Sequence, residues 1–186
     1  KNKIYVTTPI YYVNDAPHIG HAYTTILADV LSRFHRAMGD DVFFLTGLDE
    51  HGQKVQQAAE KRGLSPKAHC DDLAPRFSNL WKTLEIVHDD FIRTTEERHT
   101  RVVQAILQQV YEKGDIYQKE YEGLYSVSEE RFITEKEAES GQFREIKRIQ
   151  EKNWFFRMSK YQDQLIRYIE EHPDFIRPES RKNEML

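Results

Sequence analysis

Short apolar runs alternate with stretches of helical spacing over the first part of the chain. Residues 4–12 are rich in β-branched and aromatic side chains, which is typical of a strand, and residues 20–38 predict a helix that ends near Gly39. The apolar positions of this helix are Ile26, Ala28, Val30, Leu31 and Phe34. The later runs predict strands over 42–45 and 91–93 and helices over 49–63, 65–84 and 95–113. This order predicts right-handed βαβ units and a parallel sheet that binds ligands at the carboxyl ends of its strands.

The pattern changes after Gly114. Residues 116–125 alternate in the manner of hairpin strands, and the segment up to residue 153 is strongly charged, which indicates an insertion rather than a third βαβ repeat. The aromatic run 154–156 could stack on bases, but core packing is the favoured interpretation. A helix follows over 159–171, with Ser159 as its expected N-cap, just as Ser65 and Pro66 are expected to begin the helix over 65–84. The apolar face of the later helix carries Tyr161, Leu165, Tyr168 and Ile169.

Composition narrows the class of protein. Hydrophobic residues make up 39% and charged residues 31% of the 186 positions, which is typical of a globular domain that could hold an insertion. The chain has neither an apolar run long enough for a membrane span nor an N-terminal signal segment, so we expect a cytoplasmic protein without a membrane partner. Cys70 is the single cysteine, which excludes an internal disulfide and a thiolate zinc site.

The charge pattern limits contacts with nucleic acids. A formal net charge of −4 argues against general nucleic-acid affinity, so any contact with RNA must be local. Arg144, Lys147 and Arg148 could contact RNA, or could equally serve only to keep the insertion soluble. The run 135–139 is expected to be a solvated helix face.

A His-x-Gly-His motif at residues 18–21 stands between the first strand and the first helix. In this position the first helical turn directs unpaired backbone N–H groups and the positive end of its dipole toward a bound anion. His18 and His21 can add donors toward phosphate oxygens, and Gly20 removes a side chain that would keep an adenine ring away from the backbone. The motif therefore indicates a nucleotide phosphate site.

Two further motifs stand in register with the first. Residues 7–14 read Thr-Thr-Pro-Ile-Tyr-Tyr-Val-Asn, and residues 46–54 read Thr-Gly-Leu-Asp-Glu-His-Gly-Gln-Lys. With these three motifs the chain resembles the methionyl-tRNA synthetases, a family of class I aminoacyl-tRNA synthetases, from residue 3 to about residue 184. The resemblance implies an α/β fold: the first half of a Rossmann-type nucleotide-binding domain over 1–114, an inserted connective domain over 115–176, and over 177–186 the start of the segment leading to the second half.

The resemblance also implies the chemistry. The carboxylate of methionine would attack the α-phosphate of ATP, supplied with Mg²⁺, and the resulting methionyl-adenylate would transfer its acyl group to initiator and elongator methionine tRNA. His18 and His21 would be the catalytic residues that donate to the phosphates, and Gly20 would lie against adenine; the alternative is that the histidines only cap the helix. Many relatives carry a zinc knuckle in the insertion, but residues 121–153 contain no cysteine, so no zinc is expected.

A methionine pocket needs apolar walls, a soft partner for the thioether and a carboxylate for the ammonium group. By resemblance Asp49 would bind the ammonium, and Ile10 and Tyr12 would form the walls, while Tyr11 should face the opposite side of the strand. Ile10 could instead be plain core, and Asp49 could be a helix N-cap. His51 is assigned only weakly, and the segment 93–97 is interpreted as structural.

A second signature of the class, Lys-Met-Ser-Lys-Ser, is expected on a loop beyond this sequence. Residues 157–161 read Arg-Met-Ser-Lys-Tyr, which we reject as a match because they open a helix within the insertion. We therefore expect an incomplete catalytic portion. Two alternatives stay open: a small nucleotidyltransferase, which would need neither residues 49–52 nor the insertion, and a non-catalytic fragment that only binds ATP or methionine.

Overall fold

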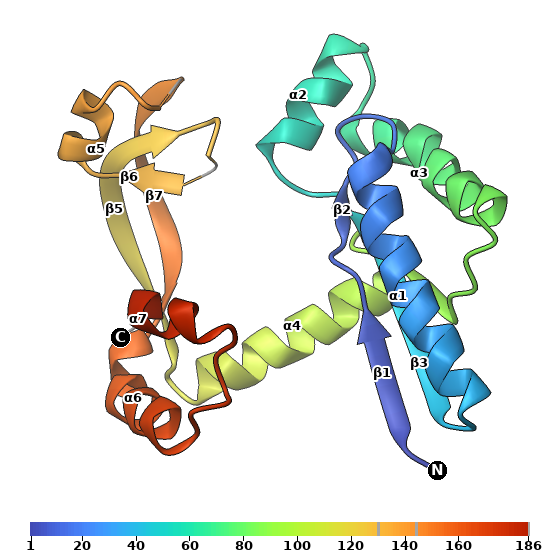
Figure 1. Cartoon of the computed structure of the whole chain (residues 1–186). Helices are drawn as coiled ribbons and strands as arrows, with labels where there is room; N and C mark the ends of the chain where they lie inside the picture. The colour runs from blue at the N-terminus through green and yellow to red at the C-terminus, as the bar shows by residue number, and fades with distance from the viewer. Residues whose placement is uncertain (130, 144, 186) are drawn as a thin grey trace. The chain divides into compact units, whose positions relative to one another are not determined.

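The computed structural model describes residues 1–129, 131–143 and 145–185, so Arg144 lies outside the described residues. The chain separates into two compact units, Lys1–Val103 and Gln104–Leu186 (Figure 1). The division falls within helix α4 (Glu97–Glu112), whereas the sequence places a boundary at residue 114, just after that helix. The limits 1–114, 115–176 and 177–186 therefore stay predictions.

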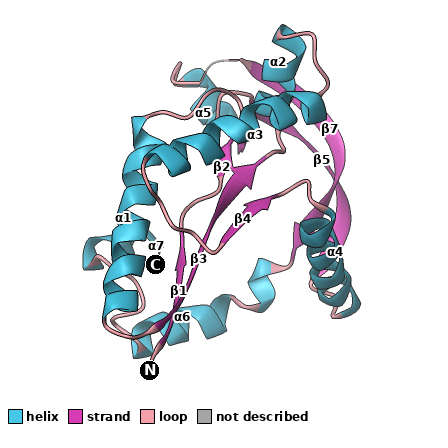
Figure 2. Ribbon diagram, turned by 90° about the vertical axis from the view of Figure 1, so that its right-hand side faces the viewer, coloured by secondary structure: helices cyan, strands magenta, loops and turns pink. Residues whose placement is uncertain are grey.

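A parallel sheet forms the centre of the first unit. Its strands are β1 (Lys3–Thr7), β2 (Tyr11–Tyr12), β3 (Asp41–Asp49) and β4 (Asp90–Arg93), and the other three each pair in parallel with β3 (Figure 2). Leu45 of β3 pairs with both Thr7 and Asp90, and Leu48 with both Tyr11 and Arg93. Strands β1 and β2 therefore lie on one side of β3 and β4 on the other, which confirms the predicted α/β class with a parallel sheet.

The prediction of one strand over 4–12 is wrong, because the strand breaks between β1 and β2. Pro9 has no N–H group and cannot donate to the ladder. The Thr8 amide still donates to the Leu45 carbonyl at 3.2 Å, and the hydroxyls of Thr8 and Thr46 lie 2.7 Å apart. The chain can then re-enter the sheet as the two-residue strand β2, beside the end of β3.

Helices connect the strands of this unit. Their bounds are α1 (Ile19–Ala37), α2 (Gln53–Lys61) and α3 (Pro66–Thr83), followed by α4. The Ser65 hydroxyl accepts a hydrogen bond from the Ala68 amide at 3.2 Å, which confirms Ser65 as N-cap with Pro66 in the first turn. Helix α2 begins later than the sequence predicts: its N-cap is Gly52, whose φ of +104° is left-handed. Asp49 is therefore not a helix N-cap.

The core of this unit joins the sheet to α3. The largest fully buried side chains are Trp81, Phe44, Phe77 and Leu48. Tyr11 faces this core with 7% of its surface exposed, while Tyr12 is 43% exposed. The two tyrosines thus face opposite ways, as strand alternation predicts.

Helix α1 buries its polar side. Thr25, Asp29 and Ser32 are buried, whereas most of the apolar positions that predicted the helix are exposed. These exposed positions are Ile26, Val30, Leu31 and Phe34, and Ala28 is the buried one. The buried polar groups are satisfied, because the Asp29 carboxylate accepts from the Val87 amide at 2.9 Å and Ser32 donates to the Ala28 carbonyl at 2.8 Å.

The second unit is built on an antiparallel sheet. Strand β5 (Ile116–Ser126) pairs with both β6 (Arg131–Ile133) and β7 (Ile146–Phe156). The helices of this unit are α5 (Glu135–Glu139), α6 (Gln162–Glu171) and α7 (Lys182–Met185), with 3-10 turns at Met158–Lys160 and Glu179–Arg181. The antiparallel strands confirm a departure from the βαβ pattern, and α5 buries no side chain, as its charges predict.

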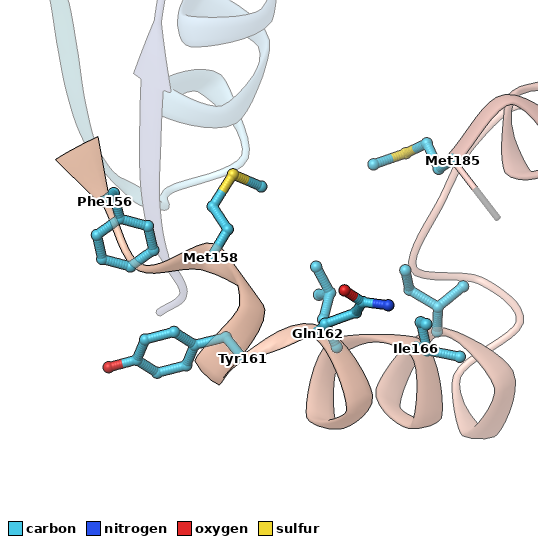
Figure 3. A pocket seen from close by; sticks show the side chains of 8 residues that line it. Phe156, Met158, Tyr161, Gln162, Ile166 and Met185 are labelled. Carbon is cyan, nitrogen blue, oxygen red and sulfur yellow. The ribbon is translucent and has the colours of Figure 1, made fainter. Parts of the chain in front are cut away.

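Two expectations for the second unit are wrong. Trp154 and Phe156 are 57% and 51% exposed, so they are not core residues. Ser159 lies inside the 3-10 turn, and the N-cap of α6 is Tyr161. An apolar pocket of about 360 Å³ lies here, lined by side chains that include Met158, Tyr161 and Ile166 (Figure 3). It contains none of the predicted site residues. In the described part of the chain, no helix is long and apolar enough to cross a membrane.

Candidate functional site

The candidate site lies where β2 and β3 end. Tyr12 pairs in register with Asp49, and the next residue, Val13, donates its amide to the Asp49 carbonyl at 3.3 Å. The carbonyl of Val13 accepts a hydrogen bond of 2.8 Å from Nε2 of His69, a fully buried side chain of α3. Val13, the first residue after β2, is thus hydrogen-bonded through both its amide and its carbonyl, to β3 and to α3.

His18 and His21 together form the amino-terminal cap of α1. Nδ1 of His18 accepts from the Gly20 amide at 3.1 Å, and Nδ1 of His21 accepts from the His18 amide at 3.2 Å. The two imidazole rings stack with centroids 3.7 Å apart. The two histidines therefore do cap the helix, which is the alternative that the sequence left open.

Capping does not exclude a role in phosphate binding. Because each Nδ1 accepts a backbone N–H, each neutral imidazole carries its proton on Nε2. No partner for either Nε2 occurs among the described residues. Burial, followed by the neighbouring charge of His18, lowers the pKa of His21. The pair therefore offers two N–H donors while His21 is neutral.

Tyr11 and Thr25 hold His21 from below. The Tyr11 ring lies 4.7 Å from the His21 ring, and its hydroxyl lies 2.8 Å from that of Thr25. Thr25 in turn donates to the His21 carbonyl at 2.9 Å. These contacts fix the imidazole to the buried side of the sheet, and the sequence analysis assigned neither residue a role.

The local geometry also requires a glycine at position 20, apart from any role in adenine binding. A Cβ at this position would lie 2.9 Å from Cε1 of His18, closer than side-chain atoms normally approach. Any other residue would displace the His18 ring from its capping position. The glycine thus keeps the histidine pair in place.

The predicted methionine-site residues are only partly brought together. Tyr12 and Asp49 are neighbours across the β2–β3 ladder, and Asp49 is half-buried, with its carboxylate 3.4 Å from the His51 amide. Ile10 is 42% exposed, so the core interpretation of Ile10 is wrong. It lies just before β2.

Glu50, which the sequence analysis passed over, organises the end of β3. Its side chain is fully buried and accepts from Nε of Arg93 at 2.6 Å and from the Thr95 hydroxyl. Its amide donates to the Thr94 hydroxyl at 3.0 Å. Arg93, Thr94 and Thr95 thus have the structural role that the sequence predicts for them. Together they hold Glu50, the residue that follows Asp49.

The rejected motif at 157–161 has its own partners. The Lys160 ammonium forms an ion pair with Asp115, whose carboxylate also accepts from the Tyr161 hydroxyl at 2.6 Å. These bonds lower the pKa of Asp115. Lys160 is therefore engaged within the second unit, which supports the rejection.

Comparison with known proteins decides the family. The sequence model of the family described as tRNA synthetases class I (M) matches residues 4–142. The chain belongs to this family. The match includes the His-x-Gly-His motif, residues 49–52 and part of the insertion, and so favours a synthetase over a small nucleotidyltransferase.

Curated members of the family agree over the whole chain. The methionine–tRNA ligase of Thermotoga maritima is 54% identical over 99% of this chain, and that of Fusobacterium nucleatum is 52% identical over all of it. The chain spans 30% of the length of each.

Solved structures show the same relationship. Mycobacterium tuberculosis methionyl-tRNA synthetase in complex with methionyl-adenylate is 41% identical, with a TM-score of 0.90 over 99% of this chain and 38% of that one. A leucyl-tRNA synthetase from Agrobacterium radiobacter, at 22% identity and a TM-score of 0.76, shares the fold.

Proposed function

We propose that this chain is the first part of the catalytic domain of a methionine–tRNA ligase. The observation that carries the proposal is that the histidine pair and Asp49 belong to the same loop-and-strand junction, linked through Val13 and Tyr11. Its support from relatives is the methionyl-adenylate bound by the mycobacterial synthetase, which is 41% identical to this chain. The substrates are ATP, methionine and tRNA.

In the activation step the carboxylate of methionine attacks the α-phosphate of ATP, and pyrophosphate leaves. The protein supplies position and charge stabilisation rather than covalent chemistry. Nε2–H of His18 and of His21 donate to phosphate oxygens, next to the positive end of α1. Mg²⁺ enters with the ATP phosphates, as is usual for this cation. Removing one such donor typically raises the barrier by about 2–4 kcal/mol.

Methionine is held at the end of β2 and β3. The half-buried carboxylate of Asp49 pairs with the ammonium group, and the exposed faces of Tyr12 and Ile10 give the thioether an aromatic and an apolar wall. The ion pair between Glu50 and Arg93 holds the residue next to Asp49. Gly20 leaves room for adenine beside the backbone.

The finer assignments are part of the same proposal. We place the first Rossmann half at 1–114, the connective insertion without zinc at 115–176, and the segment toward the second half at 177–186. The acceptors are initiator and elongator methionine tRNA, and the location is the cytoplasm.

Binding by the chain itself tests the proposal. A non-hydrolysable methionyl-adenylate analogue, titrated by calorimetry, is expected to bind more tightly than the leucyl and isoleucyl analogues. Asp49→Asn should weaken binding about 10- to 100-fold, because a charge-assisted hydrogen bond contributes about 1.5–3 kcal/mol. Asp41→Asn, at the exposed start of the same strand, is the matched control and should bind like the wild type.

Equal binding of the three analogues, or equal loss in both variants, would contradict the methionine site. Methionine-dependent ATP–pyrophosphate exchange by this chain alone should be little or none, because it holds no accepted match to the second class signature. Exchange that occurs with methionine but not with leucine or isoleucine would show that this portion suffices to form the adenylate.

A further inference from the structure

A polar cavity lies beside the candidate site, between α2 and the loop that leaves β2. It has a volume of about 420 Å³ and is lined by Asn14 and Asp15 of the loop and by the α2 side, including Lys54, Lys61 and Arg62. We name it the α2 pocket. It brings three cationic side chains to one small space in a chain whose formal net charge is −4.

The spacing on α2 explains this concentration of charge. Lys54, Ala58 and Lys61 are separated by four and three residues, so they share one helix face, and Arg62 follows as the C-cap. The opposite face is anchored in the core by Val55 and Ala59, both fully buried. The helix therefore turns its cations outward because its apolar residues occupy the other side.

The cations are placed differently. Arg62 is fixed by hydrogen bonds to Asp72 at 2.6 Å and to Nδ1 of His69 at 3.1 Å. Lys61 is exposed and has no ion-pair partner within the described ranges. The carboxylate of Asp15 accepts from the Ala16 amide at 2.6 Å, which is part of the local turn. The pocket keeps a net positive charge with this carboxylate counted.

The α2 pocket adjoins the proposed methionine site. Its residue Asn14 directly follows Val13, whose amide is bound to the Asp49 carbonyl. The Lys54 ammonium lies 6.0 Å from the centre of the Tyr12 ring. An anion in the pocket would therefore sit next to the bound amino acid.

We propose that the α2 pocket binds a backbone phosphate at the single-stranded 3′ end of the acceptor RNA, an inference that rests on the proposed function. In the transfer step the terminal ribose hydroxyl attacks the activated carbonyl of methionine, the acyl–phosphate bond breaks, and AMP leaves. The phosphodiester before that ribose is then one nucleotide away from the amino acid. Cations and side-chain amides are the groups that hold such phosphates.

Fluorescence anisotropy tests this with a labelled RNA hairpin that ends in a single-stranded 3′ overhang. Lys61→Ala should weaken binding about fivefold at low salt, the value of one close charge pair in water, and should reduce the slope of log K against log salt by about one. Lys61→Arg should restore binding. Lys82→Ala, at the end of α3 and outside the pocket, is the matched control.

The proposal would be overturned if the wild type did not bind the hairpin, if Lys61→Ala and Lys82→Ala lost binding equally, or if a blunt hairpin bound equally well. Inorganic pyrophosphate is added as competitor. If calorimetry shows that pyrophosphate binds the wild type but not Lys61→Ala, and yet it leaves the RNA bound, the pocket takes a free phosphate and the RNA assignment is wrong. The adenylate-analogue titration is run on the same variants, so a failed methionine site is recognised separately.

Discussion

Gly47 of β3 pairs with Ile92 of β4, and its replacement by alanine tests how closely these two strands pack. A Cβ at this position would lie 2.1 Å from the Ile92 carbonyl oxygen and 2.6 Å from Cγ2 of the same residue. A carbon and a carbonyl oxygen normally stay about 3.3 Å apart or more. The strands would have to separate by about 1 Å, a fifth of the usual spacing of about 4.8 Å.

The cost follows from two terms. Overpacking of a buried site costs about 1–3 kcal/mol, and one or two weakened ladder hydrogen bonds add about 1 kcal/mol each. Gly47→Ala should therefore destabilise the first unit by about 2–5 kcal/mol. With a slope of about 1–2 kcal/mol per M of urea, the unfolding midpoint should fall by at least about 1 M.

Tryptophan fluorescence can follow this unit selectively. Trp81 is buried in the first unit and Trp154 lies in the second, so a Trp154→Phe background reports the first unit alone. Gly123→Ala in β5 controls for selectivity, because it lies in the second unit and should leave the Trp81 transition unchanged. An unchanged urea midpoint for Gly47→Ala would refute the reasoning.

Three further predictions concern titration and reactivity. Burial and the nearby charge of Glu50 raise the pKa of Cys70 to about 11, so iodoacetamide at pH 8 should modify this thiol only after unfolding; rapid alkylation of the native chain would contradict this. The folded-state pKa of His21 lies below its ordinary value, so neutral His21 favours folding; urea midpoints read from Trp81 should fall as the pH drops below about 6.5, and His21→Gln should lessen that fall. Hydrogen bonds from Lys160 and Tyr161 lower the pKa of Asp115 in the folded state. The ionised Asp115 therefore stabilises the fold above about pH 4, and this stabilisation is lost as the pH falls through the lower folded pKa. An acid titration followed by Trp154 fluorescence should show the loss, and Asp115→Asn should remove this pH dependence.

The sequence predicts the element types well because β-branched runs and cap residues act locally. Ser65 with Pro66 places the start of α3 correctly, since a side-chain cap needs only its own helix. The break at Pro9 was missed, although proline cannot donate to a ladder, because the flanking residues are strand formers. Ser159 fails as an N-cap because the preceding 3-10 turn delays α6.

Which side of a helix is buried was harder to predict than the helix itself. The apolar spacing of α1 suggests that Val30 and Phe34 face the core, yet the sheet side carries Thr25, Asp29 and Ser32. Those polar groups are buried at low cost because each is hydrogen-bonded: Thr25 and Ser32 to carbonyls of their own helix, and Asp29 to the distant Val87 amide. Sequence spacing cannot reveal a partner 58 residues away.

In the candidate site, too, the sequence predicts some features and not others. The motifs place His18, His21 and Asp49 at the strand ends because strand–turn–helix order dictates that placement. The supporting contacts, such as Tyr11 against His21 and Arg93 with Glu50, depend on tertiary packing and could not be predicted from spacing.

Mutual capping makes His18 and His21 a single mutational unit. Replacing either residue removes an imidazole and also leaves a backbone amide at the start of α1 without its partner, so each single variant loses more than one interaction. The two losses should not add, and a double-mutant cycle should give a substantial coupling free energy. Kinetics of one alanine variant would thus overstate what one imidazole contributes to catalysis. His18→Asn separates the effects, because asparagine can cap the helix without supplying the ring.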